Sequence, residues 1–251
     1  MSSFAISLIA FVTMSGGALL GMFLRTALPG HHLADESRDV VKLATGLVGT
    51  MAALVLGLLV ASAKGSFDAQ TTELIQMSAN IVVLDRTLAH YGPEATETRE
   101  ALRNAVAGLL NQLSSKNRPG GSRLEPAPTT REIVYDRIQA LTPRDDLQRS
   151  VRSQALAMAV NLAQTRWLMY EQGAKSVSKP LLAVMVFWLT VTFVIWGLLA
   201  APNGTLIATL LTSALSASGA ILLILEMYIP YGGLIRISDA PLRSALAQLG
   251  Q

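Results

Sequence analysis

The sequence has no cysteine and little charge. Without cysteine, the chain can form no disulfide, no thiolate metal site and no cysteine nucleophile. Charged residues make up only 15% of its 251 residues, whereas soluble domains carry about 25%. Hydrophobic residues make up 51%, and the mean hydropathy is +0.43. This composition indicates a membrane protein.

The charges that are present nearly cancel. The chain has 20 Lys and Arg against 17 Asp and Glu, a net charge of +3. Binding to nucleic acid would require basic residues concentrated on one face, and the sequence has no such concentration. We therefore expect no nucleic-acid partner.

Four apolar stretches are long enough to cross a bilayer, which takes about 20 residues. They are residues 4–24, 43–63, 181–200 and 205–229. No Lys or Arg precedes the first stretch and no small-residue cleavage site follows it, so it reads as a retained span rather than a signal peptide. Four nearly uncharged runs are also hard to reconcile with the core of a soluble protein. The sequence predicts an all-α integral membrane protein with four transmembrane helices.

The connections between the spans define the topology. A long polar insert, residues 64–180, separates spans two and three, and the "APNG" turn joins spans three and four. One side of the membrane carries six basic residues near span ends, and the other side carries three. The six are Lys64, Arg166, Lys175, Lys179, Arg236 and Arg243, and the three are Arg25, Arg38 and Lys42. Because positive loops stay in the cytoplasm, we expect the insert and both termini there.

The insert has helical periodicity. Apolar residues at a helical spacing follow span two without a strong breaker, so this span should continue into the cytoplasm. They are Leu74, Met77, Ile81, Leu84 and Leu88. "HYGPE" should end this helix and Pro93 begin another. Residues 114–130 read as a mobile loop, and "TPRDD" should start a further helix with Thr142 as its cap. That helix should run on to Pro180, and from Leu147 to Met169 it has a heptad-like seam typical of a helix with a partner. The predicted segments are thus 1–63, 64–180, 181–229 and an interfacial 230–251.

Small residues recur every four positions in the first two spans. Such ladders allow close helix packing, either within one subunit or between subunits. The candidates are Gly17, Gly21, Gly49, Ala53, Gly57 and Ala61.

Span four has a stripe of hydroxyl residues and one carboxylate. The hydroxyls could pack against their own helix or line a narrow wet path. Glu226 lies about 32 Å along the helix from the start of the span, at the far edge of the hydrocarbon. It could pair with a nearby cation or form an acidic ring at a pore exit. The pore-lining candidates are Thr205, Thr209, Thr212, Ser216 and Glu226.

The chain after span four reads as a surface segment. Pro230 and the pair Gly232–Gly233 should end the helix, and Tyr228 with Tyr231 fits an interfacial aromatic belt. Residues 239–249 could form an amphipathic helix on the membrane surface. Its apolar side would be Leu242, Leu246 and Leu249.

No catalytic constellation or cofactor motif is evident. "HHLADE" places His31 four residues before Asp35, but adjacent histidines diverge and a solvated loop is the simpler interpretation. We therefore expect no enzyme activity, no metal and no cofactor.

Several segments resemble the bacterial bestrophin-like domain family, whose function is unknown. They are "LDRTLAHYGPEATETREALR", "LAQTRWLMYEQ", "VFWLTVTFVIWGLLAAPN" and "LILEMYIPYGGLIRISDAPLRSALAQL", together with residues 37–70. The family pattern Pro-Phe-Ser-Gly is replaced here by Pro230, Tyr231, Gly232 and Gly233, followed by Arg236. The resemblance implies a four-span protein of the bacterial inner membrane. The family name suggests kinship with bestrophins, which are oligomeric anion channels, but no specific pore motif carries over.

Two functions are compatible with these features. One is a homo-oligomeric channel in the lipid bilayer, most simply for a small inorganic anion. The other is a membrane-anchored scaffold whose cytoplasmic helices bind a protein partner.

Overall fold

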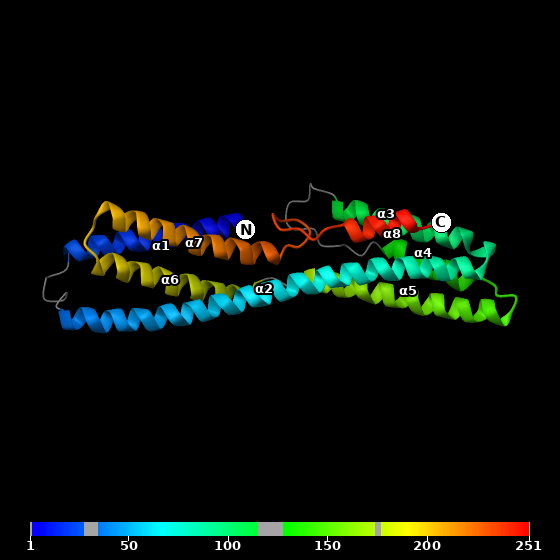
Figure 1. Ribbon diagram of the computed structural model, residues 1–251, viewed down its shortest axis with the longest axis horizontal. Helices are drawn as coiled ribbons and strands as arrows, with labels where there is room; N and C mark the ends of the chain where they lie inside the picture. The colour runs from blue at the N-terminus through cyan, green and yellow to red at the C-terminus, as the bar shows by residue number, and fades with distance from the viewer. Residues whose placement is uncertain (1, 28–34, 115–127, 174–176, 251) are drawn as a thin grey trace. The chain divides into compact units, whose positions relative to one another are not determined.

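The computed structural model describes residues 2–27, 35–114, 128–173 and 177–250, and every regular element in these ranges is a helix (Figure 1). The order is α1 (Ser3–Ala27), α2 (Asp35–Tyr91), the short 3-10 helix η2 (Pro93–Ala95), α3 (Thr96–Ser114), α4 (Pro128–Ala140), α5 (Asp146–Gly173), α6 (Lys179–Leu199), α7 (Gly204–Met227) and α8 (Ala240–Gln248). The predicted loop 114–130 lies almost entirely outside the described residues.

Four of these helices are long and apolar enough to cross a membrane: α1, α2, α6 and α7. Their number agrees with the four predicted spans. Helix α2 has 57 residues, of which only the first part is apolar. It therefore runs on past its span into the polar insert, as the apolar stripe from Leu74 to Leu88 predicted.

The chain divides into two compact units. The span unit comprises Met1–Gly65 and Ser176–Tyr228, and the insert unit comprises Ser66–Lys175 and Ile229–Gln251. The segment after span four therefore groups with the insert, whereas the sequence had suggested a separate interfacial segment.

The span unit is built around α1, which packs against both α6 and α7 (Figure 1). Met14 of α1, Met185 of α6 and Ile221 of α7 are fully buried in its core. The α6–α7 turn is fixed by Asn203, whose side chain accepts a hydrogen bond from the amide of Leu206 at 2.7 Å. This satisfies one of the free N–H groups at the start of α7.

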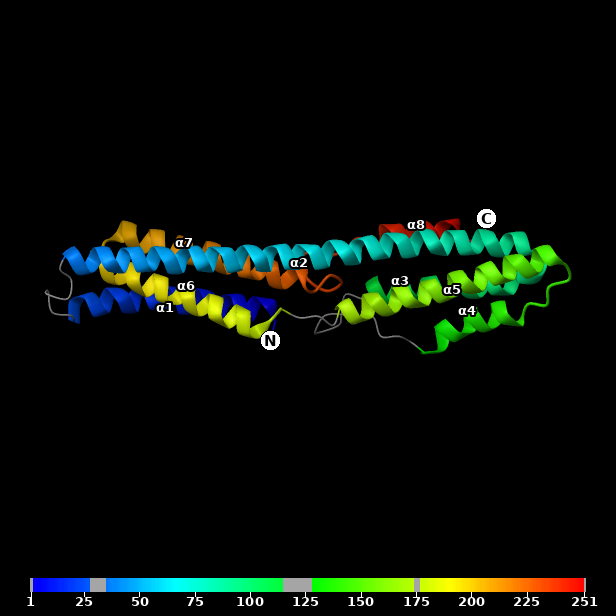
Figure 2. The same ribbon diagram turned by 90° about the horizontal axis from the view of Figure 1, so that it is seen from below.

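The insert unit pairs α5 with the second part of α2 (Figure 2). Side-chain contacts join the two helices along their length in antiparallel order. They link Glu73 with Gln172, Asn80 with Asn161, Thr87 with Met158 and the carbonyl of Tyr91 with Gln148. The seam of α5 that indicated a partner helix thus finds one within the same chain, because Ala155 and Met169 are buried in the insert core.

Helix α5 begins later than predicted. Its first residue is Asp146, and the carboxylate of Asp145 accepts a hydrogen bond from the amide of Gln148 at 2.7 Å. Asp145 is therefore the cap, and the prediction of Thr142 is wrong. Aspartate and threonine are both good caps, so the sequence did not distinguish them.

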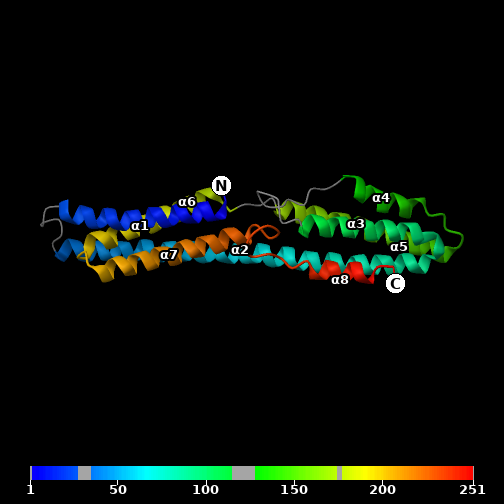
Figure 3. The same cartoon turned by 90° about the horizontal axis from the view of Figure 1, so that it is seen from above.

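Helix α8 is part of the insert core and packs against α3. Figure 3 shows it alongside the second part of α2. Leu242 and Leu249 are almost completely buried in the cluster that also contains Leu84 and Leu102, and Leu246 is partly buried there. The apolar side that was expected to face the membrane is thus covered by protein. Amphipathic periodicity shows that a helix has an apolar side but not what covers it.

A buried ion pair holds α2, α3 and the end of the chain together. Both carboxylate oxygens of Asp85, which is fully buried, accept hydrogen bonds from Arg99 at 2.8 Å. One of these oxygens also accepts the amide of Gly250 at 3.3 Å. Burial opposes ionisation of Asp85, but the hydrogen bonds from Arg99 and Gly250 outweigh it and lower the pKa of the carboxyl group.

We expect the substitution Asp85→Asn to destabilise the insert by about 3 kcal/mol, because it leaves Arg99 without its counter-charge in a largely buried site. The pKa of Asp85 is lowered in the folded protein, so its contribution is complete above the unfolded pKa of about 3.9 and disappears as the pH falls through the folded value. Hydrogen exchange of α2, α3 and α8 in the full chain measures both effects.

The control for this experiment is Glu97→Gln, since Glu97 forms an exposed pair with Arg137. Such pairs contribute less than about 1 kcal/mol. Equal effects of the two substitutions, or an Asp85→Asn effect that does not diminish at all as the pH falls below about 3.9, would contradict the assignment.

Candidate functional site

The hydroxyl stripe of α7 lies on the outside of the span unit. Each of its four side chains is exposed, including Thr205 at the helix start. The hydroxyls of Thr209, Thr212 and Ser216 each donate to a carbonyl of the preceding helical turn at 2.9 Å. These hydroxyls therefore bond to their own helix, and none of these three bonds joins α7 to another element of the subunit.

Glu226 is separated from this stripe. It is 8% exposed and lies between the buried residue Leu225 and the end of α7. The structure thus places the five pore-lining candidates in two groups, with four hydroxyls outside and the carboxylate inside. Sequence spacing alone gave Glu226 a position along the helix axis but did not show that its surroundings were covered.

The small residues of α1 are used inside the subunit. A Cβ atom on Gly17 would lie 3.1 Å from the carbonyl oxygen of Thr190, and one on Gly21 would overlap the carbonyl of Val194. From the opposite side, a Cβ on Gly197 would overlap the carbonyl of Ala18. Helices α1 and α6 therefore approach backbone to backbone, as small residues in spans allow.

The small residues of α2 have a different environment. Ala53, Gly57 and Ala61 are exposed and Gly49 is half-buried. A Cβ atom on either glycine would meet no atom within 4 Å. Large apolar neighbours, among them Leu54 and Leu58, are exposed beside them. This face, which we call the α2 small-residue face, is not used for packing within the subunit.

The segment after α7 folds back on itself. The amides of Gly232 and Gly233 both donate to the carbonyl of Ile229 at 3.3 Å, and the amide of Ile237 donates to Pro230 at 2.9 Å. Neither glycine has a positive φ angle, so the turn does not depend on glycine's access to the left-handed region. Tyr228 is half-buried, and its hydroxyl lies 3.1 Å from that of Ser62.

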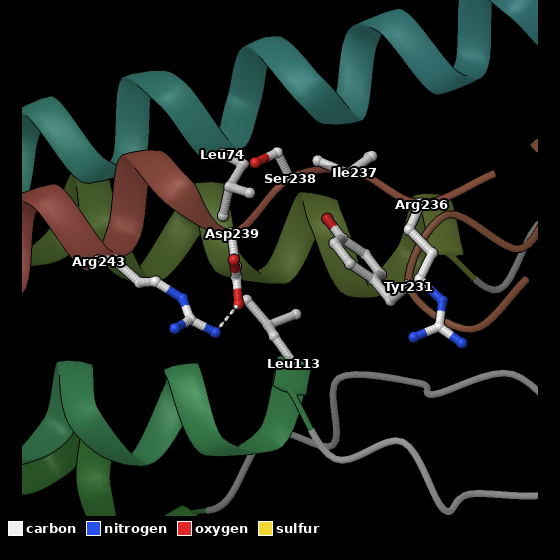
Figure 4. A pocket seen from close by; sticks show the side chains of 8 residues that line it. All are labelled: Leu74, Leu113, Tyr231, Arg236, Ile237, Ser238, Asp239 and Arg243. Carbon is white, nitrogen blue, oxygen red and sulfur yellow. Dashed lines mark hydrogen bonds and ion pairs between the residues drawn. The ribbon is translucent and has the colours of Figure 1, made fainter. Parts of the chain in front are cut away.

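The segment from Pro230 to Arg236, whose sequence resembles the family pattern, forms one wall of a cavity of about 290 Å³ in the insert unit (Figure 4). Figure 4 shows Arg236 on one side of Tyr231 and Leu113, and Arg243 with Asp239 on the other. The ion pair from Arg243 to Asp239 measures 2.8 Å. The lining residues are Leu74, Leu113, Tyr231, Arg236, Ile237, Ser238, Asp239 and Arg243. We call this the signature pocket.

The signature pocket was not predicted as a site. The four-residue spacing of Asp239 and Arg243 on a helical segment indicates an ion pair, but Leu74 and Leu113 come from distant parts of the chain. The hydroxyl of Tyr231 is buried without a hydrogen-bond partner. Its burial, with a smaller contribution from the charge of Glu73, raises the pKa of Tyr231 above the ordinary value.

Metal binding has no support in the parts of the chain that the structure describes. These parts contain no group of three or more potential His, Asp or Glu ligands that could hold an ion. His31 and the rest of the loop up to residue 34 lie outside the described ranges, so the structure does not test that pair.

In the described ranges the fold is all-helical, with four helices long and apolar enough to cross a membrane and a set of polar helices between the second and the third. Comparison with protein families matches residues 12–242 to the Bestrophin-like domain. The chain belongs to the bestrophin-like domain family, as its motifs indicated. No curated protein and no solved structure matches the chain.

We expect Gly21→Ala to destabilise the span unit by about 3 kcal/mol or more, because the added methyl group meets backbone rather than a movable side chain. The matched control is Gly16→Ala on the same helix, where a Cβ atom meets nothing within 4 Å. Thermal unfolding of both variants in detergent tests this. A Gly21→Ala protein as stable as the control would show that α1 and α6 are farther apart.

Proposed function

We propose that the chain assembles into a homo-oligomeric anion channel in a bacterial inner membrane. The observation that carries the proposal is the outward position of the α7 hydroxyl stripe in a single subunit. Hydroxyl groups contribute little stabilisation when they face lipid, whereas they can line a narrow aqueous path between subunits. Membership of a family that is related in general terms to anion channels supports the same conclusion.

The α2 small-residue face supports assembly. Bilayer lipid provides no hydrophobic driving force between helices, and spans associate instead through close packing of small residues. Gly49, Ala53, Gly57 and Ala61 offer such a surface, and nothing within the subunit occupies it. We assign α2 to the contact between subunits and α7 to the conducting path.

The chemistry of α7 favours an anion over a cation. The exposed stripe has O–H groups that can turn to donate to an anion, and no carboxylate shares it, because Glu226 is buried. A cation pathway would be expected to carry acidic side chains.

The proposed topology places the insert and both termini in the cytoplasm, following the six-to-three excess of basic residues. Because the chain has no cysteine, single introduced cysteines at Ser2 and Asn203 can be labelled without background. A membrane-impermeant reagent should reach only Asn203 in intact cells, and labelling of Ser2 instead would reverse the topology.

A scaffold function remains the second candidate because α5 has an uncovered apolar surface. Trp167, Leu168 and Val160 are exposed on this helix, and surfaces of this kind often mark contacts with a protein partner. A scaffold of this kind would bind its protein partner without conducting ions.

We expect the purified chain to be an oligomer in mild detergent and Gly57→Leu to shift it toward monomers. The added side chain faces open space in the subunit, so the fold should survive while the close contact between subunits is lost. Light scattering on the eluted protein measures the mass, and Gly16→Leu, also in open space but on α1 instead of the α2 small-residue face, is the control. Unchanged mass for Gly57→Leu would remove α2 from the interface.

We expect the chain to conduct chloride in liposomes, with flux lowered several-fold by Thr209→Val. This substitution keeps the shape of the side chain and removes its hydroxyl from the outward stripe. The control is Thr192→Val, since the hydroxyl of Thr192 bonds to its own helix on the buried side of α6. An intact oligomer without chloride flux would favour the scaffold, and equal effects of the two substitutions would exclude α7 as the conducting path.

A further inference from the structure

The signature pocket has no role in the proposed conduction. It nevertheless gathers two arginines, a buried tyrosine hydroxyl and three aliphatic side chains around about 290 Å³, close to the lower limit of small-molecule sites. Tyr231 and Arg236 belong to the motif that carries the family resemblance. The side chains that line this cavity therefore indicate the chemistry of a ligand that would fit it.

The charges of the pocket leave one cation uncompensated. Arg243 is paired with Asp239 at 2.8 Å, so these two charges largely cancel. The Nε atom of Arg236 donates to the carbonyl of Gly233 at 2.8 Å, which orients its guanidinium group. Its two terminal nitrogens have neither a hydrogen bond nor an ion pair to any residue in the described ranges. Arg236 is thus a preoriented donor fork toward an anion.

One further carboxylate lies close by. Glu73 is near enough to Tyr231 to raise the pKa of its phenol, but Glu73 does not line the pocket. One oxygen of Glu73 accepts a hydrogen bond from Gln172 at 2.6 Å. The side chains that do line the cavity carry two positive charges and one negative charge, so the lining favours an anion.

The remaining walls are apolar. Leu74, Leu113 and Ile237 line the cavity together with the ring of Tyr231 (Figure 4). A bare inorganic anion would leave these walls without contacts. The complementary ligand therefore has an anionic group for Arg236 and a less polar part for the tyrosine ring and the aliphatic side chains.

We propose that the signature pocket binds a phosphate group attached to an apolar body, with the phosphate on Arg236. Arginine matches phosphate oxygens with two parallel hydrogen bonds. The ligand could be the headgroup of an anionic lipid or a soluble phosphate ester. Tyr231 follows the end of α7 by only a few residues along the chain, which favours the lipid. Binding at this site requires no ion conduction, so the binding proposal can be tested independently of the channel proposal.

Two binding measurements on the full chain distinguish the sources. In the first, phenyl phosphate is titrated calorimetrically into protein in phosphatidylcholine nanodiscs. In the second, native mass spectrometry compares retention of phosphatidic acid and phosphatidylcholine by protein from mixed vesicles. Binding in the first identifies a soluble ester, and selective retention in the second alone identifies a lipid headgroup.

Arg236→Gln should weaken the observed binding about tenfold or more, as expected for loss of hydrogen bonds to a charged group. Arg236→Lys keeps the positive charge but loses the two parallel donors of the guanidinium group, so it should weaken binding less. It replaces Arg236→Gln as the test variant if that protein does not fold. The matched control is Arg149→Gln, an exposed arginine of α5 that is paired with Asp146 outside this pocket. No binding in either measurement, or equal losses for Arg236 and Arg149 variants, would overturn the proposal.

Discussion

The backbone contact between α1 and α6 determines what the other spans can do. Gly21 and Gly197 have no room for even a methyl group, because each faces a carbonyl of the other helix. This contact uses Gly17 and Gly21, the ladder residues of α1, and α1 packs against both α6 and α7. The small residues of α2 and the hydroxyls of α7 are then left facing outward. The two faces that carry the proposed function are thus a consequence of how the subunit closes on itself.

A similar closure occurs in the insert. The seam of α5 and the apolar side of α8 both looked like surfaces for something outside the chain, a partner helix and a membrane. Both are buried against the insert's own helices, and Asp85 additionally binds the amide of Gly250 near the end of the chain. Among the described residues of the insert's long helices, exposed apolar side chains remain on α5 around Leu168 and on α2 at Ile75 and Val83. The burial of the α5 seam and of the apolar side of α8 is an argument against the scaffold hypothesis and does not affect the channel hypothesis.

The sequence predicted what depends on local composition and periodicity. The four spans, the continuation of α2 past its apolar part and its end at Tyr91 followed by Pro93 all correspond to helices in the structure. The sequence could not predict what depends on tertiary neighbours. Gly17 and Gly57 occupy equivalent ladders, but only Gly17 has a helix against it. For Glu226, the sequence indicated the position along the span but not the burial of the side chain. The signature pocket could not be predicted because Leu74 and Leu113 come from distant segments of the chain.

The C-terminal motif shows why conduction and ligand binding can be separate properties of one chain. Its proline ends α7 and its backbone turns are closed by amide hydrogen bonds to Ile229 and Pro230. Those bonds use main-chain atoms only, so a turn alone would not require an arginine at position 236 or an aromatic ring at position 231. Arg236 does not close an ion pair with any described residue, and the phenol of Tyr231 is buried without a hydrogen bond. The ring of Tyr231 packs against the insert core, but its unpaired hydroxyl costs free energy, and Arg236 gives the fold one hydrogen bond, to Gly233. A ligand that used the guanidinium and covered the ring would give each of them a function that the turn itself does not need.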